Sequence, residues 1–220
     1  MPSTSTIKEQ LTAVYDDLFK QLSDIEDALI KQFFQTDPTA DPVDPQEYDF
    51  HVKSYCILAH AALEDYFESV VLKIMHHSCN VWLTSQKATE PLLYLLCFYG
   101  SRPKIKVDDR EDEKSCYSYL KENIDSIVSA FSKEVNNNHG ISLKYLKKLL
   151  LPVGLNIMNE TRVIESLNRL AKYRGDVAHK GIVRSFLSPE DARDQVADCL
   201  ELCEHIHQTA LNKMQDINFV

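Results

Sequence analysis

Residues 167–181 read Leu-Asn-Arg-Leu-Ala-Lys-Tyr-Arg-Gly-Asp-Val-Ala-His-Lys-Gly and decide how the rest of the chain is interpreted. The stretch predicts a helix with one apolar stripe, because Val163, Leu167 and Leu170 recur at i, i+4 and i+7. The next position on that stripe is Arg174, and a guanidinium in a core-facing row requires a partner or a function. Five residues later comes His179, whose side-chain type titrates nearest neutral pH. The pair is therefore the first candidate for chemistry.

The spacing of Arg174 and His179 leaves two geometries open. Five residues on a straight α-helix correspond to a rotation of about 140°, so the two side chains would point to different faces. Gly175 weakens the helix by roughly 1 kcal/mol relative to alanine. Either the helix distorts after Arg174 and the two side chains converge, or they serve different faces that a dimer brings together. A purely structural alternative is a buried ion pair for Arg174 and a favourable position near a helix C-terminus for His179.

Such a pair could support cleavage of RNA without a metal ion. A histidine can accept the proton of a 2′-hydroxyl as a general base. An arginine can bind the phosphate through two hydrogen bonds and stabilise the charge that develops on its oxygens. The expected product end is a 2′,3′-cyclic phosphate.

The remaining sequence predicts an all-α protein. Five glycines in 220 residues are few, and apolar spacing of three and four recurs over residues 5–35, 47–77 and 114–134. One or two short helices are expected within 80–100, and a charged loop over 101–113. A short basic helix is expected over 143–151, with Ser142 as a plausible N-cap, and Asn159 is expected to cap the helix that runs into Arg174. Ser188 and Pro189 open a last helix in the preferred way.

Charge is distributed unevenly along the chain. The net charge is −9, yet residues 142–186 carry 9 Lys and Arg against 3 Asp and Glu, a net +6. Residues 1–50 carry 3 against 11, a net −8. A basic segment around Arg174 and His179 could attract a polyanion, and the alternative is a solvated helix face with lysines on it.

The six cysteines form no CxxC pair, and we expect reduced, mostly buried thiols in a cytoplasmic protein. The N-terminus is polar and resembles no signal peptide, and no apolar run approaches the roughly 18 residues of a membrane span. Cys199, Cys203 and His207 repeat at i, i+4 and i+8, which could hold zinc, but cysteines acting as small core residues are the favoured interpretation.

Arg174-Gly-Asp-Val-Ala-His179, together with the apolar helix before it, resembles the signature of the HEPN domain family, Arg followed after four to six residues by His. Three further segments resemble that family: Ala61–Phe67 with its embedded Glu64, the basic segment Ser142–Leu151, and Ser188–Asp191. The resemblance covers roughly residues 47–210. It implies an antiparallel helical bundle over residues 46–220, preceded by an additional acidic helix and a proline-rich linker over 1–45.

The resemblance also implies a function. HEPN proteins of this type are metal-independent endoribonucleases that act as homodimers, with the active site at the interface, in toxin–antitoxin and antiviral defence systems. The expected site consists of Arg174, His179 and Asp176, with Glu64, Lys180 and Tyr173 as supporting residues; the expected partners are RNA, a second copy, and an antitoxin or other defence protein. No cofactor, metal or membrane is expected.

One departure from the family pattern lies directly after the arginine. The family often has a polar residue there, typically Asn, whereas this chain has Gly175 followed by Asp176. Either Asp176 takes the polar role by orienting Arg174 or His179, or the chain has lost activity and kept the fold. In the second case the protein would be a non-catalytic module that binds RNA, a nucleotide or a partner protein.

Overall fold

The computed structural model describes residues 5–34, 43–101, 116–180 and 187–214, without the side chains of Cys116 and residues 178–180. These residues form helices and no strand, which confirms the predicted all-α class. The elements in chain order are α1 (Ile7–Leu29), η1 (Lys31–Phe33), α2 (Pro45–Ser85), α3 (Glu90–Tyr99), α4 (Cys116–Asn136), α5 (Leu143–Leu150), η2 (Leu151–Val153), α6 (Thr161–Lys180) and α7 (Pro189–Lys213).

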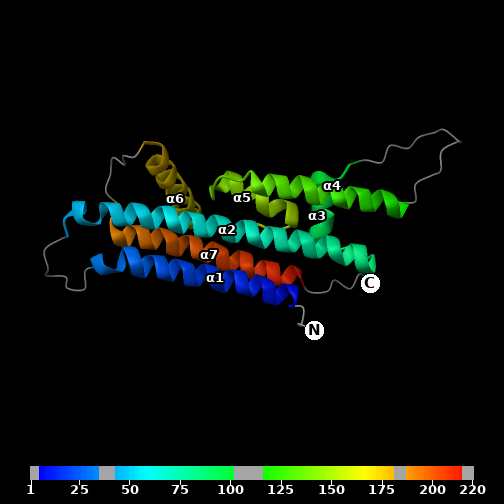
Figure 1. Cartoon of the computed structure of the whole chain (residues 1–220), viewed down its shortest axis with the longest axis horizontal. Coiled ribbons are helices and arrows are strands. Elements are labelled where there is room, and N and C mark those ends of the chain that lie inside the picture. Colours follow the sequence, from blue (N-terminus) through cyan, green and yellow to red (C-terminus); the bar gives the residue numbers. More distant parts are fainter. Residues whose placement is uncertain (1–4, 35–42, 102–115, 181–186, 215–220) are drawn as a thin grey trace.

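Helix α2 is the axis of the molecule, and the other long helices pack around it (Figure 1). It begins after Asp44, whose carboxylate accepts a hydrogen bond from the backbone N–H of Gln46, and it ends at Gln86 in the left-handed conformation. Its 41 residues correspond to about 61 Å. The predicted end at residue 77 was wrong, because Ser78, Cys79 and Trp82 continue the buried face of the helix.

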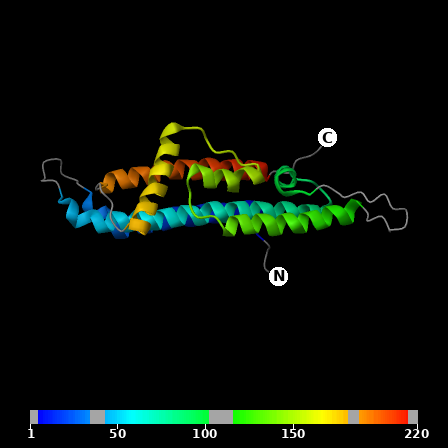
Figure 2. The ribbon, with the colours of Figure 1, turned by 90° about the horizontal axis from the view of Figure 1, so that it is seen from above.

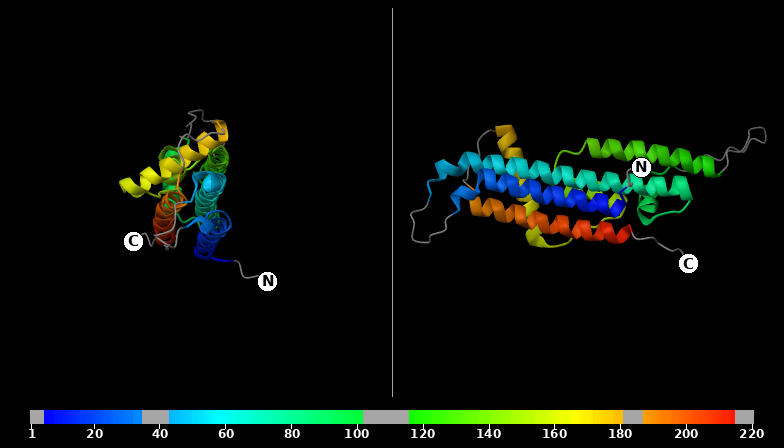
Figure 3. Two further views of the ribbon diagram at one scale, coloured as in Figure 1. Left: turned by 90° about the vertical axis from the view of Figure 1, so that its left-hand side faces the viewer. Right: turned by 60° about the horizontal axis from the view of Figure 1, so that its bottom comes forward.

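Helix α1 lies beside α2 and α7, as the views from two further directions show (Figure 3). Its N-terminus carries a capping box in which Thr6 and Glu9 satisfy each other's backbone N–H groups. Its buried side chains are Leu11, Leu18 and Leu22, at the spacing the sequence predicted. The acidic helix is therefore packed into the hydrophobic core, while a domain boundary at residue 45 stays a prediction.

The colours along the chain in Figure 1 give the directions of the helices. Helices α2 and α7 run the same way, and α1 and α4 run against them. Helix α4 lies along the second half of α2. Helix α3 contacts both of these helices and crosses α2 near the C-terminal end of α2. Seen from above, α6 crosses the long helices steeply instead of lying along them (Figure 2). The C-terminal half of α6 is thereby set against α2.

Helix α6 is continuous from Thr161 to Lys180. Gly175 does not interrupt it, and a Cβ at that position would meet nothing within 4 Å. The helix begins two residues after Asn159, so the cap predicted at Asn159 was placed one residue too early. Ser188, in contrast, caps α7 as predicted, accepting a hydrogen bond from the backbone N–H of Asp191.

Gly154 ends the α5–η2 segment, with φ of 75°. This left-handed conformation suits glycine, and a Cβ there would lie only 2.9 Å from the Tyr94 ring. Glycine at position 154 therefore leaves room for Tyr94 of α3 to pack close to the end of η2.

Within the part of the chain that the structure describes, no helix combines the length and the apolar character that a bilayer crossing requires.

Candidate functional site

Arg174 extends the apolar stripe of α6, as the sequence predicted. Val163, Leu167 and Leu170 are fully buried, and Arg174 is half-buried at the next position of that face. Its positive charge acts on two side chains of α2, lowering the pKa of His60 and opposing the rise in the pKa of Glu64. The arginine is therefore directed to α2, where the helix carries polar side chains in an otherwise apolar face.

His60 is the most buried member of this group, with 2% of its surface exposed. Burial, together with the nearby Arg174 charge, lowers the pKa of His60 to about 4. Its Nδ1 lies 3.8 Å from Oε2 of Glu64, which is one helical turn further along α2. Because the imidazole is neutral near pH 7, this contact is not an ion pair.

Glu64 and Glu68 are joined by Asn138, which lies in the turn after α4. The Asn138 side-chain amide donates to Oε1 of Glu68 at 2.9 Å and to Oε1 of Glu64 at 3.4 Å. Burial raises the pKa of both carboxyl groups, and the neighbouring His139 opposes the shift in each. The turn is thus anchored on α2 at Glu68 and at Glu64, and the charge of Arg174 acts on the second of these carboxyl groups.

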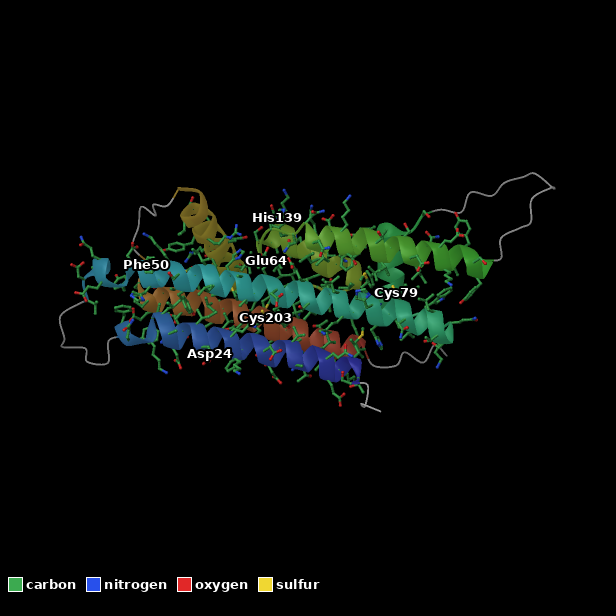
Figure 4. The ribbon with its side chains drawn as sticks, in the orientation of Figure 1. Asp24, Phe50, Glu64, Cys79, His139 and Cys203 are labelled. Atoms are coloured by element: carbon green, nitrogen blue, oxygen red, sulfur yellow. The ribbon has the colours of Figure 1, made fainter. Side chains whose placement is uncertain are left out.

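The residues His60, Glu64, Glu68, Asn138, His139 and Arg174 are called the polar cluster below. Figure 4 shows Glu64 on α2 with His139 close to it on the neighbouring turn. The sequence predicted Arg174 and Glu64 as members, but not Asn138 or His139. Seventy or more residues separate Asn138 from its two partners in the chain, and an Asn-rich turn carries no signal of such a contact.

His179 is the second residue of the predicted pair, and the structure describes only its backbone. His179 and Lys180 belong to α6 by their backbone, and their side chains lie outside the described residues. On the unbroken helix, positions 174 and 179 are about 140° apart, whereas 176 and 179 are neighbours at i, i+3. Asp176 itself is half-buried and makes an interaction of its own. Of the two geometries the sequence left open, the backbone of α6 has the straight one.

Tyr173 packs against the hydrophobic core and lies near the N-terminal part of α2. Its hydroxyl is buried with no hydrogen-bond partner among the described atoms. Burial is the main cause that raises the pKa of Tyr173, with further contributions from Cys56 and Asp49 in the N-terminal part of α2. The structure therefore places the Tyr173 hydroxyl in the core.

A family model described as RiboL-PSP-HEPN matches residues 15–212. The chain belongs to the RiboL-PSP-HEPN family. The matched range begins inside α1 and is wider than the 47–210 that resembled the family in the sequence. No curated protein and no solved structure matches the chain.

The HEPN domain uses part of its basic segment in internal ion pairs. Arg162 of α6 binds Asp198 and Glu201 of α7. Arg169 lies 3.1 Å from Glu165 on the same helix, and Lys148 of α5 lies 3.2 Å from Glu134 of α4. These basic side chains are already paired with carboxylates, so the net charge of +6 overstates what this segment offers to a polyanion. The exposed side chains of Lys144, Lys147 and Lys172 remain at the surface.

The Cys199–Cys203–His207 row of the HEPN domain lies in the core. Both cysteines are fully buried, and His207 stacks on Tyr15 with ring centroids 4.7 Å apart. The hydroxyl of Tyr66 donates to the backbone oxygen of Cys203 at 2.9 Å. Among the described residues no group of three or more His, Cys, Asp or Glu could hold a metal ion. The favoured interpretation of this row as core residues agrees with its burial.

Proposed function

We propose that this HEPN protein is a metal-independent endoribonuclease. His179 acts as the general base that takes the proton of a 2′-hydroxyl, and Arg174 binds the phosphate that this oxygen attacks. Asp176 orients His179 from the adjacent position on the same helix face. The products are a 2′,3′-cyclic phosphate and a free 5′-hydroxyl.

The observation that carries this proposal is the position of Arg174. An arginine keeps its charge in any protein environment, and here it lies half-buried beside α2, within the matched family range and five residues before a histidine. A guanidinium that is partly desolvated, yet still reached by solvent, binds phosphate more strongly than a fully hydrated one. On the protein side, its charge acts on the Glu64 carboxyl group of α2.

The straight course of α6 supports a homodimer as the active form. Because positions 174 and 179 lie on different faces of one helix, a single subunit would not direct both side chains at one phosphate. Two copies related by a two-fold axis could each contribute one residue to a shared groove. We further propose a cytoplasmic protein whose partners are RNA and an antitoxin or other defence-system protein.

A second candidate function is a non-catalytic module that binds RNA, a nucleotide or a partner protein. Two observations favour it: Gly175 replaces the polar residue that often follows the arginine, and the unbroken helix separates the pair. In this case Arg174 would bind phosphate without cleavage.

The deciding experiment measures RNA cleavage by the purified protein in EDTA. We expect wild type to release 2′,3′-cyclic phosphate ends, and Arg174→Ala and His179→Ala to be slower by about 100- to 1,000-fold. Arg169→Ala is the matched control, because Arg169 is an exposed arginine on the same helix. Equal activity in all four proteins would reject the site. Inactive wild type that still binds RNA, with weaker binding by Arg174→Ala, would establish the binding module instead.

A further inference from the structure

The proposed cleavage requires a proton donor that neither Arg174 nor His179 supplies. When the 2′-oxygen attacks phosphorus, the 5′-oxygen leaves, and an alkoxide is a poor leaving group unless it is protonated. His179 already accepts a proton in this step, and arginine does not release one. The general acid is therefore a second group, different from the His179 that accepts the proton, and the inference that follows rests on the proposed function.

The turn between α4 and α5 places His139 beside the part of α2 on which the charge of Arg174 acts. Asn138 fixes the turn through its bonds to Glu64 and Glu68, and its amide also donates to the backbone oxygen of Gly140 at 3.2 Å. On the other side, a Cβ at Gly140 would lie 3.6 Å from Nε2 of His60, so the backbone there packs against the imidazole. His139 is held between these two anchors.

His139 is exposed, although its neighbours in the turn are anchored. Its side chain lies close to Glu64, as Figure 4 shows, and its charge acts on both Glu64 and Glu68. Arg174 acts on the same Glu64 carboxyl group. The histidine and the arginine thus approach one carboxylate from two different elements.

We propose that His139 is the general acid of the cleavage reaction, protonating the 5′-oxygen of the phosphate that Arg174 binds. The 2′-oxygen forms a bond to phosphorus and gives its proton to His179. The bond from phosphorus to the 5′-oxygen breaks, and this oxygen takes the proton of the His139 imidazolium. Atoms and charge balance, and solvent returns the two histidines to their starting forms.

The other titratable members of the polar cluster are less suited to this role. His60 is neutral and has only 2% of its surface exposed. The oxygens of Glu64 are engaged, one by the Asn138 amide and one beside His60, and the Asn138 amide also binds Glu68. His139 alone among them combines a side chain that can donate a proton with direct access to solvent.

The test compares two oligonucleotides of one sequence that wild type cleaves. In the second, sulfur replaces the leaving 5′-oxygen, and a thiolate leaves without a proton. For His139→Ala and His139→Gln we expect kcat/KM on the normal oligonucleotide to fall by about 100- to 10,000-fold. On the sulfur-containing one we expect a change of less than about 5-fold. His76→Ala is the matched control, since His76 is an exposed histidine elsewhere on α2.

Each outcome decides the proposal. Equal losses on both oligonucleotides would overturn it, because a residue that only positions the substrate slows both. Unchanged cleavage of the normal oligonucleotide by His139→Ala, while Arg174→Ala is inactive, would overturn the role of His139 and leave the ribonuclease function intact. Absence of cleavage by wild type would remove the ribonuclease function and the role of His139 together.

Discussion

His207 of α7 and His60 of α2 are both buried histidines, with 5% and 2% of their surfaces exposed, yet their surroundings differ. His207 stacks on Tyr15 within the core. Burial lowers its pKa, and the carboxylates of Asp16 and Glu204 oppose that shift. Burial also lowers the pKa of His60, but there the charge of Arg174 adds to the effect.

The comparison shows that burial lowers the pKa of a histidine in both surroundings, and that burial by itself says little about function. What distinguishes the α2 region is an arginine brought from another helix and a turn anchored by side-chain hydrogen bonds. His207 thus lies among core side chains, whereas His60 lies in a group of side chains joined by polar contacts. Three predictions follow this difference.

The largest effect on stability is expected in the α7 region. Ile206→Ala removes a fully buried side chain one residue from His207, and should lower the free energy of unfolding by about 3 kcal/mol. The control is Leu58→Ala, since Leu58 is 48% exposed, with an expected change below about 0.5 kcal/mol. Urea denaturation at pH 7 measures both. If Ile206→Ala lowers the free energy of unfolding as little as Leu58→Ala does, α7 is not part of a tightly packed core.

An intermediate effect on stability is expected when the pH is lowered from 7 to 5. Because the pKa of His60 is about 4 in the folded protein and about 6.5 in the unfolded chain, the folded state binds fewer protons between these values. The contribution of neutral His60 to the free energy of unfolding is therefore fully present above pH 6.5 and is lost as the pH falls toward 4. At pH 5 the loss from this group should be about 2 kcal/mol relative to pH 7.

The pH effect is isolated by comparing wild type with His60→Gln in urea at pH 7 and pH 5. The raised pKa values of Glu64 and Glu68 act in the opposite direction, but both proteins share them. A difference between the two proteins that does not change with pH would contradict a buried, neutral His60. His207→Gln provides the matching measurement for α7.

The smallest effect is expected for the turn that carries His139. Asn138→Ala removes the amide that joins Glu64 and Glu68, and should lower the free energy of unfolding by about 1 kcal/mol. Asn136→Ala is the control, because Asn136 is exposed at the end of α4. If the two variants have equal stability, the hydrogen bonds of Asn138 contribute nothing measurable.

Apolar spacing identified the helices because each one buries a stripe that is visible in its own residues. Leu11, Leu18 and Leu22 of α1, and Val163, Leu167 and Leu170 of α6, are clear cases. The pattern failed at the end of α2, where His76, His77 and Asn80 interrupt the apolar run on the outer side. The inner side continues to Trp82, and only packing against other helices shows this.

The candidate site was predictable only where its residues share an element or a family signature. Arg174 and Glu64 were identified in this way. Asn138 and His139 belong to a turn, and their position depends on how α4 is placed against α2, which no local pattern encodes. Whether Gly175 bends α6 could not be decided either, because its propensity cost of about 1 kcal/mol is small against the packing of the whole helix.

Trp82 stacks on Tyr117 near the C-terminal end of α2, with ring centroids 5.3 Å apart. It is the single tryptophan of the chain, and the 22 residues from His60 to Trp82 correspond to about 33 Å along the helix. The fluorescence of Trp82 will therefore report the contact of α4 with α2, and it will not change when a ligand binds near Arg174. Agreement between that signal and circular dichroism during denaturation would show that the contact of α4 with α2 is lost in the same cooperative transition as the helical structure of the protein.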